Sequence, residues 1–143
     1  DWEKAFSKIH PDALLTSLRR FGVNEDFVKH IQSIYKKPQF QVRAMGQLSS
    51  SKTASTGIKQ GCPLSPYLFL VVHSAIMWDV QQLLTEEGNK AMPWIHSERT
   101  PLFDLVYADD TVIMANNSST VEQALRHVQN VAAHYNLAQP GQL

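Results

Sequence analysis

Two adjacent aspartates, Asp109 and Asp110, separate two short, mostly apolar segments in this chain of 143 residues. Residues 102–107 and 111–115 are rich in β-branched, aromatic and aliphatic side chains, which predicts two strands joined by a tight turn. Like charges at the edge of a core repel each other, and desolvation adds to that cost. The pair therefore either stays in solvent, as Asp often does in turns, or binds a cation. Such oxygen ligands favour Mg²⁺ or Mn²⁺ over zinc.

Four helices are expected around this hairpin, each with an apolar stripe at helical spacing. Their starts and stops come from capping residues, proline and glycine. The expected spans run from Pro11 to Gly22, from the N-cap Asn24 to Pro38, from the N-cap Ser65 to Gly88, and from Ser119, which opens a capping box with Glu122, to about Tyr135.

Between the second and third helices the sequence turns polar. Residues 40–44 alternate apolar with polar side chains, which predicts a half-buried strand, and residues 45–56 read as a polar hairpin region. A glycine-punctuated loop follows at residues 57–61. We therefore expect one domain of the α+β class, in which a small antiparallel sheet carries all four helices on one face.

Bulk composition limits the possible roles of the chain. Its 13 basic and 13 acidic residues cancel, which argues against strong nucleic-acid binding by this segment alone. The lone Cys62 provides no disulfide framework. No uninterrupted apolar run reaches the ~18 residues of a membrane span, and no secretory signal opens the chain. We expect an intracellular protein without a membrane partner, and the choice between nucleus and cytoplasm stays open.

Three motifs stand in order along the chain. They are Asp1-Trp2-Glu3-Lys4-Ala5-Phe6, the segment from Gly57 to Phe69 that contains Gln60-Gly61-Cys62-Pro63-Leu64-Ser65-Pro66, and Tyr107-Ala108-Asp109-Asp110. Together they resemble the catalytic motifs of reverse transcriptases, and their amino-acid residues are most similar to those of non-LTR (LINE-type) retrotransposons. The resemblance covers nearly the whole chain, and implies that residues 1–143 are a partial reverse transcriptase domain: the palm, without fingers and thumb.

The resemblance also implies RNA-templated DNA synthesis by two-metal nucleotidyl transfer. Asp1 and Asp109 would bridge two Mg²⁺ ions (Mn²⁺ being possible), Asp110 would be the third carboxylate, and the backbone carbonyl of Trp2 would lie near one ion. The implied partners are an RNA template, a DNA primer, deoxynucleoside triphosphates and the remainder of a larger polyprotein.

Four further residues are implied to meet the nucleotide: Phe6, Gln60, Gly61 and Tyr107. Phe6 would be an aromatic steric gate that excludes a 2′-hydroxyl. The alternative for Phe6 is an ordinary core residue. Gln60 and Gly61 would pack against the incoming nucleotide, because glycine permits close backbone approach and the amide can bond to sugar or base. The alternative for that loop is a plain entry into the following helix.

Two positions depart from the family pattern. Ser7 stands where related proteins usually have Asp, and no Lys or Arg follows Arg126, so the usual leaving-group lysine has no counterpart. A degenerate, non-catalytic retroelement remnant is therefore the first alternative. The second is a non-enzymatic nucleic-acid-binding module, which should carry basic or aromatic residues where the carboxylates stand. With the basic fingers residues absent, we expect the isolated chain to have little or no activity.

Overall fold

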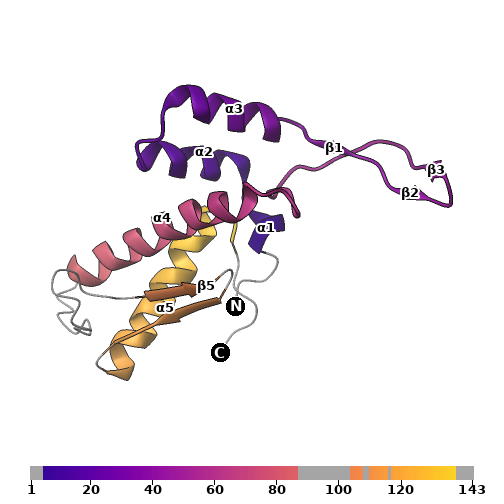
Figure 1. Cartoon of the computed structure of the whole chain (residues 1–143). Coiled ribbons are helices and arrows are strands. Elements are labelled where there is room, and N and C mark those ends of the chain that lie inside the picture. Colours follow the sequence, from indigo (N-terminus) through magenta and orange to yellow (C-terminus); the bar gives the residue numbers. More distant parts are fainter. Residues whose placement is uncertain (1–4, 87–103, 108–109, 116, 138–143) are drawn as a thin grey trace.

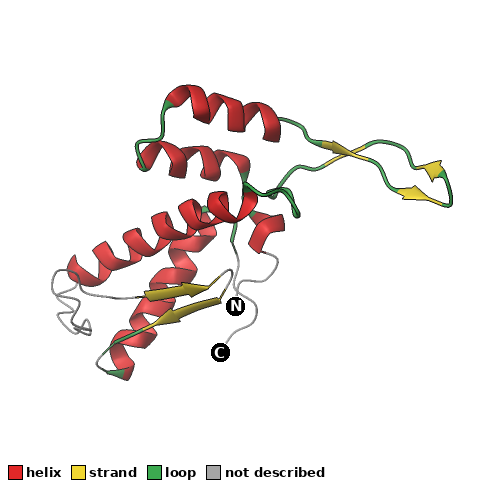
Figure 2. Ribbon diagram, in the orientation of Figure 1, coloured by secondary structure: helices red, strands yellow, loops and turns green. Residues whose placement is uncertain are grey.

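The computed structural model describes residues 5–86, 104–107, 110–115 and 117–137 of the chain (Figure 1). Helices alternate with three separate two-stranded antiparallel sheets (Figure 2), so the expected α+β class is confirmed. The elements are α1 (Ala5–Lys8), α2 (Pro11–Arg20), α3 (Glu25–Tyr35), β1 (Gln39–Phe40), β2 (Arg43–Ala44), β3 (Gln47–Leu48), β4 (Lys52–Thr53), α4 (Ser65–Glu86), β5 (Asp104–Tyr107), β6 (Asp110–Ile113) and α5 (Ser118–His134).

Helix α4 is the centre of the hydrophobic core. It packs against α5 and α2, and α1 meets it near its first turns. Its buried side chains occur on most of its circumference, as expected for a helix covered from several directions. They are Ser65, Leu68, Phe69, Val72, His73, Ala75, Ile76, Met77, Val80 and Leu84.

The two N-terminal helices begin and end as predicted. Asn24 caps α3, because its Oδ1 accepts a hydrogen bond from the Asp26 N–H at 2.8 Å. Pro11 is the first residue of α2, and Gly22 follows that helix with a φ of +70°, a conformation that glycine adopts without strain. His10, which the sequence did not single out, caps α2 through its Nδ1.

Two predicted caps are wrong. Helix α5 is capped by Asn117, whose Oδ1 accepts from the Thr120 N–H at 2.8 Å, rather than by Ser119. Starting the helix earlier lets Thr120 face the core, where it is buried. Ser65 is the first residue of α4, and its hydroxyl donates to the Lys59 carbonyl oxygen at 2.6 Å. This hydrogen bond attaches the preceding loop to the helix. The predicted C-terminal end of α4 at Gly88 lies outside the described residues.

Residues 38–54 form a long hairpin, here called the arm, that projects away from the helices (Figure 1). Strand β1 pairs with β4 and β2 with β3, and Met45 and Gly46 close the turn with φ of +49° and +79°. The predicted polar hairpin is therefore confirmed. The predicted half-buried strand at residues 40–44 is wrong: every residue from Gln39 to Thr53 is exposed, because none of the described helices or other sheets covers the arm.

The second hairpin, β5–β6, has two distinct faces. Asp104 and Val106 of β5 are half-buried, as are their partners Ile113 and Thr111 of β6. The opposite face, with the pair Tyr107 and Asp110, is exposed. The predicted strands are confirmed, although Asp110 begins β6 instead of lying in the turn.

The predicted cover of the sheet by all four helices is wrong. The hairpin contacts α4 through Thr111, whereas α2 packs on another side of α4 and α3 packs on α2. Figure 1 shows α2 and α3 across α4 from β5. The N-terminal helices therefore form a second layer, which supports α4 rather than the hairpin.

Helix α4 is also the one helix of the described residues that is long and apolar enough to cross a membrane, with a mean hydropathy of 1.3 over its best window. Half of that window is buried inside the fold. A core helix of a globular domain has the same properties, so this helix alone is weak evidence for a membrane span. The absence of a membrane partner stays a prediction.

Candidate active site

One of the three predicted carboxylates lies in the described part of the chain. Asp110 is paired with Tyr107 at the end of the β5–β6 hairpin, and both side chains are exposed; the Tyr107 side chain is 84% exposed. Asp1, Trp2 and Asp109 lie outside the described residues. The hairpin thus presents a carboxylate and a phenol side by side to solvent, in a register that directs both away from the core.

The strand that carries Asp110 is held by a buried histidine. His73 Nε2 of α4 lies 2.8 Å from Thr111 Oγ1 of β6, within hydrogen-bond distance. The imidazole is only 2% exposed, and burial lowers its pKa to about 4, so it is neutral at pH 7. The sequence alone did not single out His73. Its place in the apolar stripe, four residues after Phe69, was the available signal.

Phe6 makes a core contact and keeps part of its side chain accessible. Its ring stacks on Phe69 of α4 with centroids 5.2 Å apart, so part of the side chain belongs to the core. It is nevertheless only half-buried. Phe69 in turn lies against His73 at 5.9 Å. Contacts therefore run from α1 through α4 to Thr111, the neighbour of Asp110.

The glycine loop is fastened to α1 by its backbone. The N–H of Ile58 donates to the Phe6 carbonyl at 2.6 Å, and the N–H of Gly57 donates to the Ile9 carbonyl at 2.8 Å. Gly57 has a φ of +92°, and a Cβ there would lie 2.7 Å from the Ser7 carbonyl oxygen. Only glycine fits such a close backbone approach. Two predicted nucleotide-contacting elements, the Phe6 helix and the loop that leads to Gln60, are therefore adjacent.

Gln60 and Gly61 are both exposed. Gln60 lines a cleft of about 850 Å³ that runs from the glycine loop to the base of the arm. Gly61 has a φ of +80°, and a Cβ there would meet only open space. The loop leaves an accessible amide at the edge of a cleft, and its contact with a nucleotide stays a prediction. No bond between this loop and Tyr107 or Asp110 is formed among the described residues.

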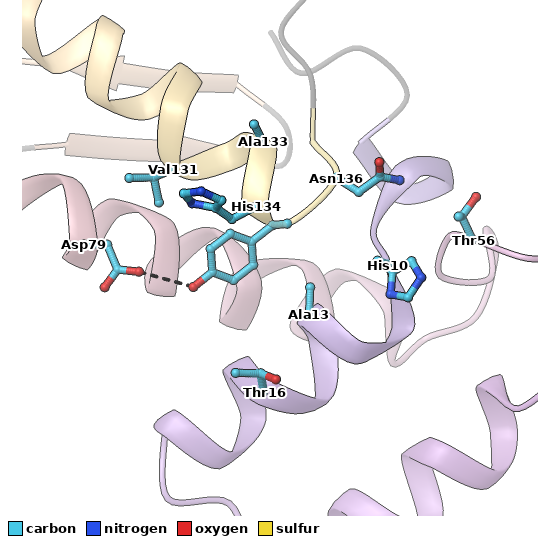
Figure 3. A pocket seen from close by; sticks show the side chains of 10 residues that line it. His10, Ala13, Thr16, Thr56, Asp79, Val131, Ala133, His134 and Asn136 are labelled. Atoms are coloured by element: carbon cyan, nitrogen blue, oxygen red, sulfur yellow. Dashed lines mark hydrogen bonds between the residues drawn. The ribbon is translucent and has the colours of Figure 1, made fainter.

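A second cavity, of about 780 Å³, lies between α2 and α5 (Figure 3). It is lined partly by His10, His134 and Asp79, and by none of the predicted site residues within the described part of the chain. Asp79 is already paired: the Arg20 guanidinium binds its carboxylate and holds its pKa low, and the Tyr135 hydroxyl donates to it at 3.2 Å. This network ties α2, α4 and α5 together and has a structural role.

A metal site needs hard oxygen donors, and Asp110 supplies one at an exposed position. No group of three His, Cys, Asp or Glu side chains able to hold a metal is found when the search is confined to the described residues. The other two predicted carboxylate ligands are outside that part. Asp104, on the inner face of the hairpin, is different from Asp110, because burial raises the pKa of its carboxyl.

The sequence matches the reverse transcriptase (RNA-dependent DNA polymerase) family over residues 1–139. It is 30% identical over 115 residues to a Pol polyprotein of the type-2 retrotransposable element R2DM from Drosophila melanogaster, covering 80% of this chain and 10% of the relative. It is 26% identical over 125 residues to a Pol polyprotein of a type-1 R2 element from Popillia japonica (87% and 20%).

A third relative is the transposon TX1 149 kDa protein of Xenopus laevis, 26% identical over 124 residues, with 87% of this chain and 9% of that protein covered. The chain thus spans between about a tenth and a fifth of these curated relatives. All three are proteins of mobile elements, which confirms the expected resemblance to non-LTR retrotransposons. The chain belongs to the reverse transcriptase family.

Proposed function

We propose that this chain is the catalytic palm of a retroelement reverse transcriptase, which adds deoxynucleotides to a DNA primer on an RNA template. The observation that carries the proposal is the β5–β6 hairpin: it exposes Asp110 opposite Tyr107 at one end, contacts α4 through Thr111, and packs Ile113 against the core. Because β6 is anchored to the core, the Asp110 carboxylate keeps a fixed position. Phosphoryl transfer requires groups held in such fixed positions.

The residues fit a divalent metal. The Asp110 carboxylate is a hard oxygen donor in solvent, and in the proposal Asp1, Asp109 and the Trp2 carbonyl complete the ligand set. When bound, a pair of Mg²⁺ ions would supply the charge that lowers the barrier to in-line displacement at phosphorus. This chain's own part is to hold the carboxylates in place, through the buried contact between His73 and Thr111.

We assign the selection of the sugar and the base of the incoming nucleotide to the elements around α1. The half-buried Phe6 ring is fixed by its stack on Phe69, which suits a steric gate against a 2′-hydroxyl. The exposed Gln60 amide and Gly61 backbone form the proposed nucleotide platform. We assign Tyr107 to the same nucleotide, because it neighbours Asp110 on the exposed face. The primer, the template and the rest of a polyprotein are proposed partners inside the cell.

The metal-binding step can be tested on the chain itself. Mn²⁺ titration by calorimetry should show binding that Asp1→Asn or Asp110→Asn weakens at least tenfold. Asp12→Asn removes a carboxylate that is also exposed, on α2, and should leave the affinity unchanged. Equal affinities for all variants would contradict the assignment and would favour a nucleic-acid-binding module or a degenerate remnant over an enzyme.

Primer extension tests the whole proposal. On poly(rA)/oligo(dT) with Mg²⁺ or Mn²⁺, we expect little or no synthesis by the 143-residue chain, because residues that would neutralise the triphosphate are not among its matched motifs. A longer polypeptide that carries this segment together with those residues should be active, and Asp109→Ala should abolish its activity. Robust synthesis by the 143-residue chain would refute the first expectation, and an inactive longer polypeptide would favour the degenerate remnant.

A further inference from the structure

The zero net charge of the chain conceals a strong separation of charge along the sequence. Between Phe27 and Trp78 there is no Asp or Glu, yet six of the 13 cations lie there. The remaining seven cations share the rest of the chain with all 13 acidic residues. The arm lies inside the acid-free segment, and every residue from Gln39 to Thr53 is exposed, so its two charged side chains are both cationic and open to solvent.

Five of these cations form what is here called the basic arm surface. All are exposed, and none forms an ion pair with another described residue. Elsewhere, by contrast, Arg19 pairs with Glu25, Arg20 with Asp79, and Arg126 with Glu122. Within the described residues, the positive charge of this surface therefore has no acidic partner. Arg43 and Lys52 lie on the arm itself, and the other three cations flank it in the sequence. The five cations are Lys36, Lys37, Arg43, Lys52 and Lys59.

Exposed apolar side chains alternate with these cations on the arm. Phe40 of β1 lies directly opposite Lys52 of β4, and Arg43 of β2 lies directly opposite Leu48 of β3. Facing residues in an antiparallel pair project on the same side of the ribbon. Phe40, which is 51% exposed, thus offers a ring face beside an ammonium group. This combination suits a base stacked on the ring with its phosphate beside the lysine.

The base of the arm is continuous with the nucleotide platform. The cleft of about 850 Å³ is lined by Gln39 and Phe40 of the arm and also by Lys59 and Gln60 of the glycine loop. A strand that crosses this cleft would pass from stacking and amide groups on the arm to the Gln60 amide. The lining of the cleft combines the apolar Ile34 and Ile58 with polar and cationic side chains, and its volume lies in the range of ordinary ligand sites.

We propose that the arm and the cleft at its base bind single-stranded nucleic acid and guide the template strand toward Gln60. The guiding role rests on the proposed function, whereas binding itself does not. Single strands fit better than duplex, because their bases are free to stack on Phe40. A protein partner is less well matched, because Lys52 faces Phe40 across the ribbon and lysine is depleted in protein–protein interfaces.

Fluorescence anisotropy with fluorescein-labelled oligo(rU) and oligo(dT) 12-mers tests the proposal on the 143-residue chain. At 50 mM KCl, Arg43→Gln/Lys52→Gln should weaken binding about tenfold and reduce the slope of log K against log salt by about 1.4, since each lost phosphate contact lowers it by about 0.7. The matched control Arg19→Gln/Arg126→Gln removes the same charge from α2 and α5 and should bind like the wild type. Oligo(rU) binding tighter than oligo(dT) would identify RNA as the preferred strand.

Phe40→Ala should weaken binding about tenfold without changing the salt slope, and Phe40→Trp should restore it, because stacking contributes about 1–3 kcal/mol per base. Phe40 is half exposed and lies outside the core, so its removal leaves the fold intact. No binding at 50 mM KCl, equal losses in arm and control variants, or preference for a 12-base-pair duplex would overturn the proposal. Concentration-dependent self-association without oligonucleotide binding would instead assign the arm to a protein contact.

The two proposals fail separately. Arg43→Gln/Lys52→Gln should bind Mn²⁺ like the wild type, because the arm carries none of the proposed metal ligands. Loss of oligonucleotide binding by Arg43→Gln/Lys52→Gln with intact Mn²⁺ affinity supports the arm assignment. A wild-type chain that binds oligonucleotide but no Mn²⁺ would contradict the proposed metal site. It would still support nucleic-acid binding by the arm.

Discussion

His73 shows how one buried polar side chain can hold the strand that carries a proposed metal ligand. An imidazole in an apolar environment is costly unless it is neutral and hydrogen-bonded, and Thr111 meets that need. The bond also fixes β6 at the residue after Asp110. Neither a metal-ligand spacing nor a nucleophile pattern marks His73 in the sequence, because its role depends on a strand 38 residues further on.

The neutral state of His73 predicts a specific pH dependence of stability. Its folded pKa of about 4 lies below the ordinary value of 6.5, so the unfolded chain binds more protons between these values. The free energy of unfolding should therefore fall as the pH drops through that window, by about 2 kcal/mol at most between pH 7 and pH 5. Urea unfolding at both pH values measures this loss.

His73→Gln should remove that dependence, because glutamine keeps a hydrogen-bonding group toward Thr111 and does not titrate. His134→Gln, an exposed histidine on α5, is the control and should retain the wild-type dependence. If wild type and His73→Gln lost stability equally on acidification, the buried neutral imidazole would not be the cause.

At the scale of single elements, helix α5 has two candidate N-cap residues, Asn117 and Ser119. Asn117 accepts from the Thr120 N–H, whereas Ser119 is an exposed residue inside the first turn. Asn117→Ala should lower the free energy of unfolding by about 1 kcal/mol, the usual cost of a lost cap. Ser119→Ala should change it by less than about 0.5 kcal/mol, as exposed substitutions do. Urea denaturation measures both changes in the free energy of unfolding. A larger loss of stability for Ser119→Ala than for Asn117→Ala would support the capping box that the sequence predicted.

Local chemistry predicted most elements, and burial explains where it failed. Proline, asparagine and apolar spacing were enough to place α2, α3 and α4. Alternation at residues 40–44 correctly indicated extended backbone, but it could not reveal that nothing packs beneath the arm. Likewise nothing in the sequence indicates the role of Arg20, because its partners Asp79 and Tyr135 lie 59 and 115 residues away. Contacts at such separations leave no local signal.

At the scale of the whole molecule, α4 connects the parts of the proposed site. Its Phe69 supports Phe6, its His73 supports Thr111, and its first residue Ser65 holds the Lys59 carbonyl of the loop before Gln60. The three motifs in the sequence correctly indicated the family, and the order along the chain gave no measure of their separation in space. That spatial arrangement depends on α4, and the pattern of its apolar positions indicates only a helix in the core.

The arm stands apart from this assembly, which leads to a prediction for the whole chain. No buried core residue lies between Tyr35 and Ile58, so the arm should add little to global stability. Replacing residues 41–51 by Asn-Gly would join Phe40 to Lys52, which already face each other, through the two-residue turn that such pairs favour. The shortened chain should keep a melting temperature within about 4 °C of the wild type, a shift that corresponds to about 1 kcal/mol.

Circular dichroism during heating measures that shift, and anisotropy with oligo(rU) measures the loss of binding in the same preparation. Because the turn and Arg43 are removed while Phe40, Lys52 and the cleft remain, binding should weaken without disappearing. Cooperative unfolding with reduced affinity would separate a folding unit built around α4 from a binding element attached to it. A collapse of cooperativity would show that the arm is part of the folding unit, although none of its side chains is buried.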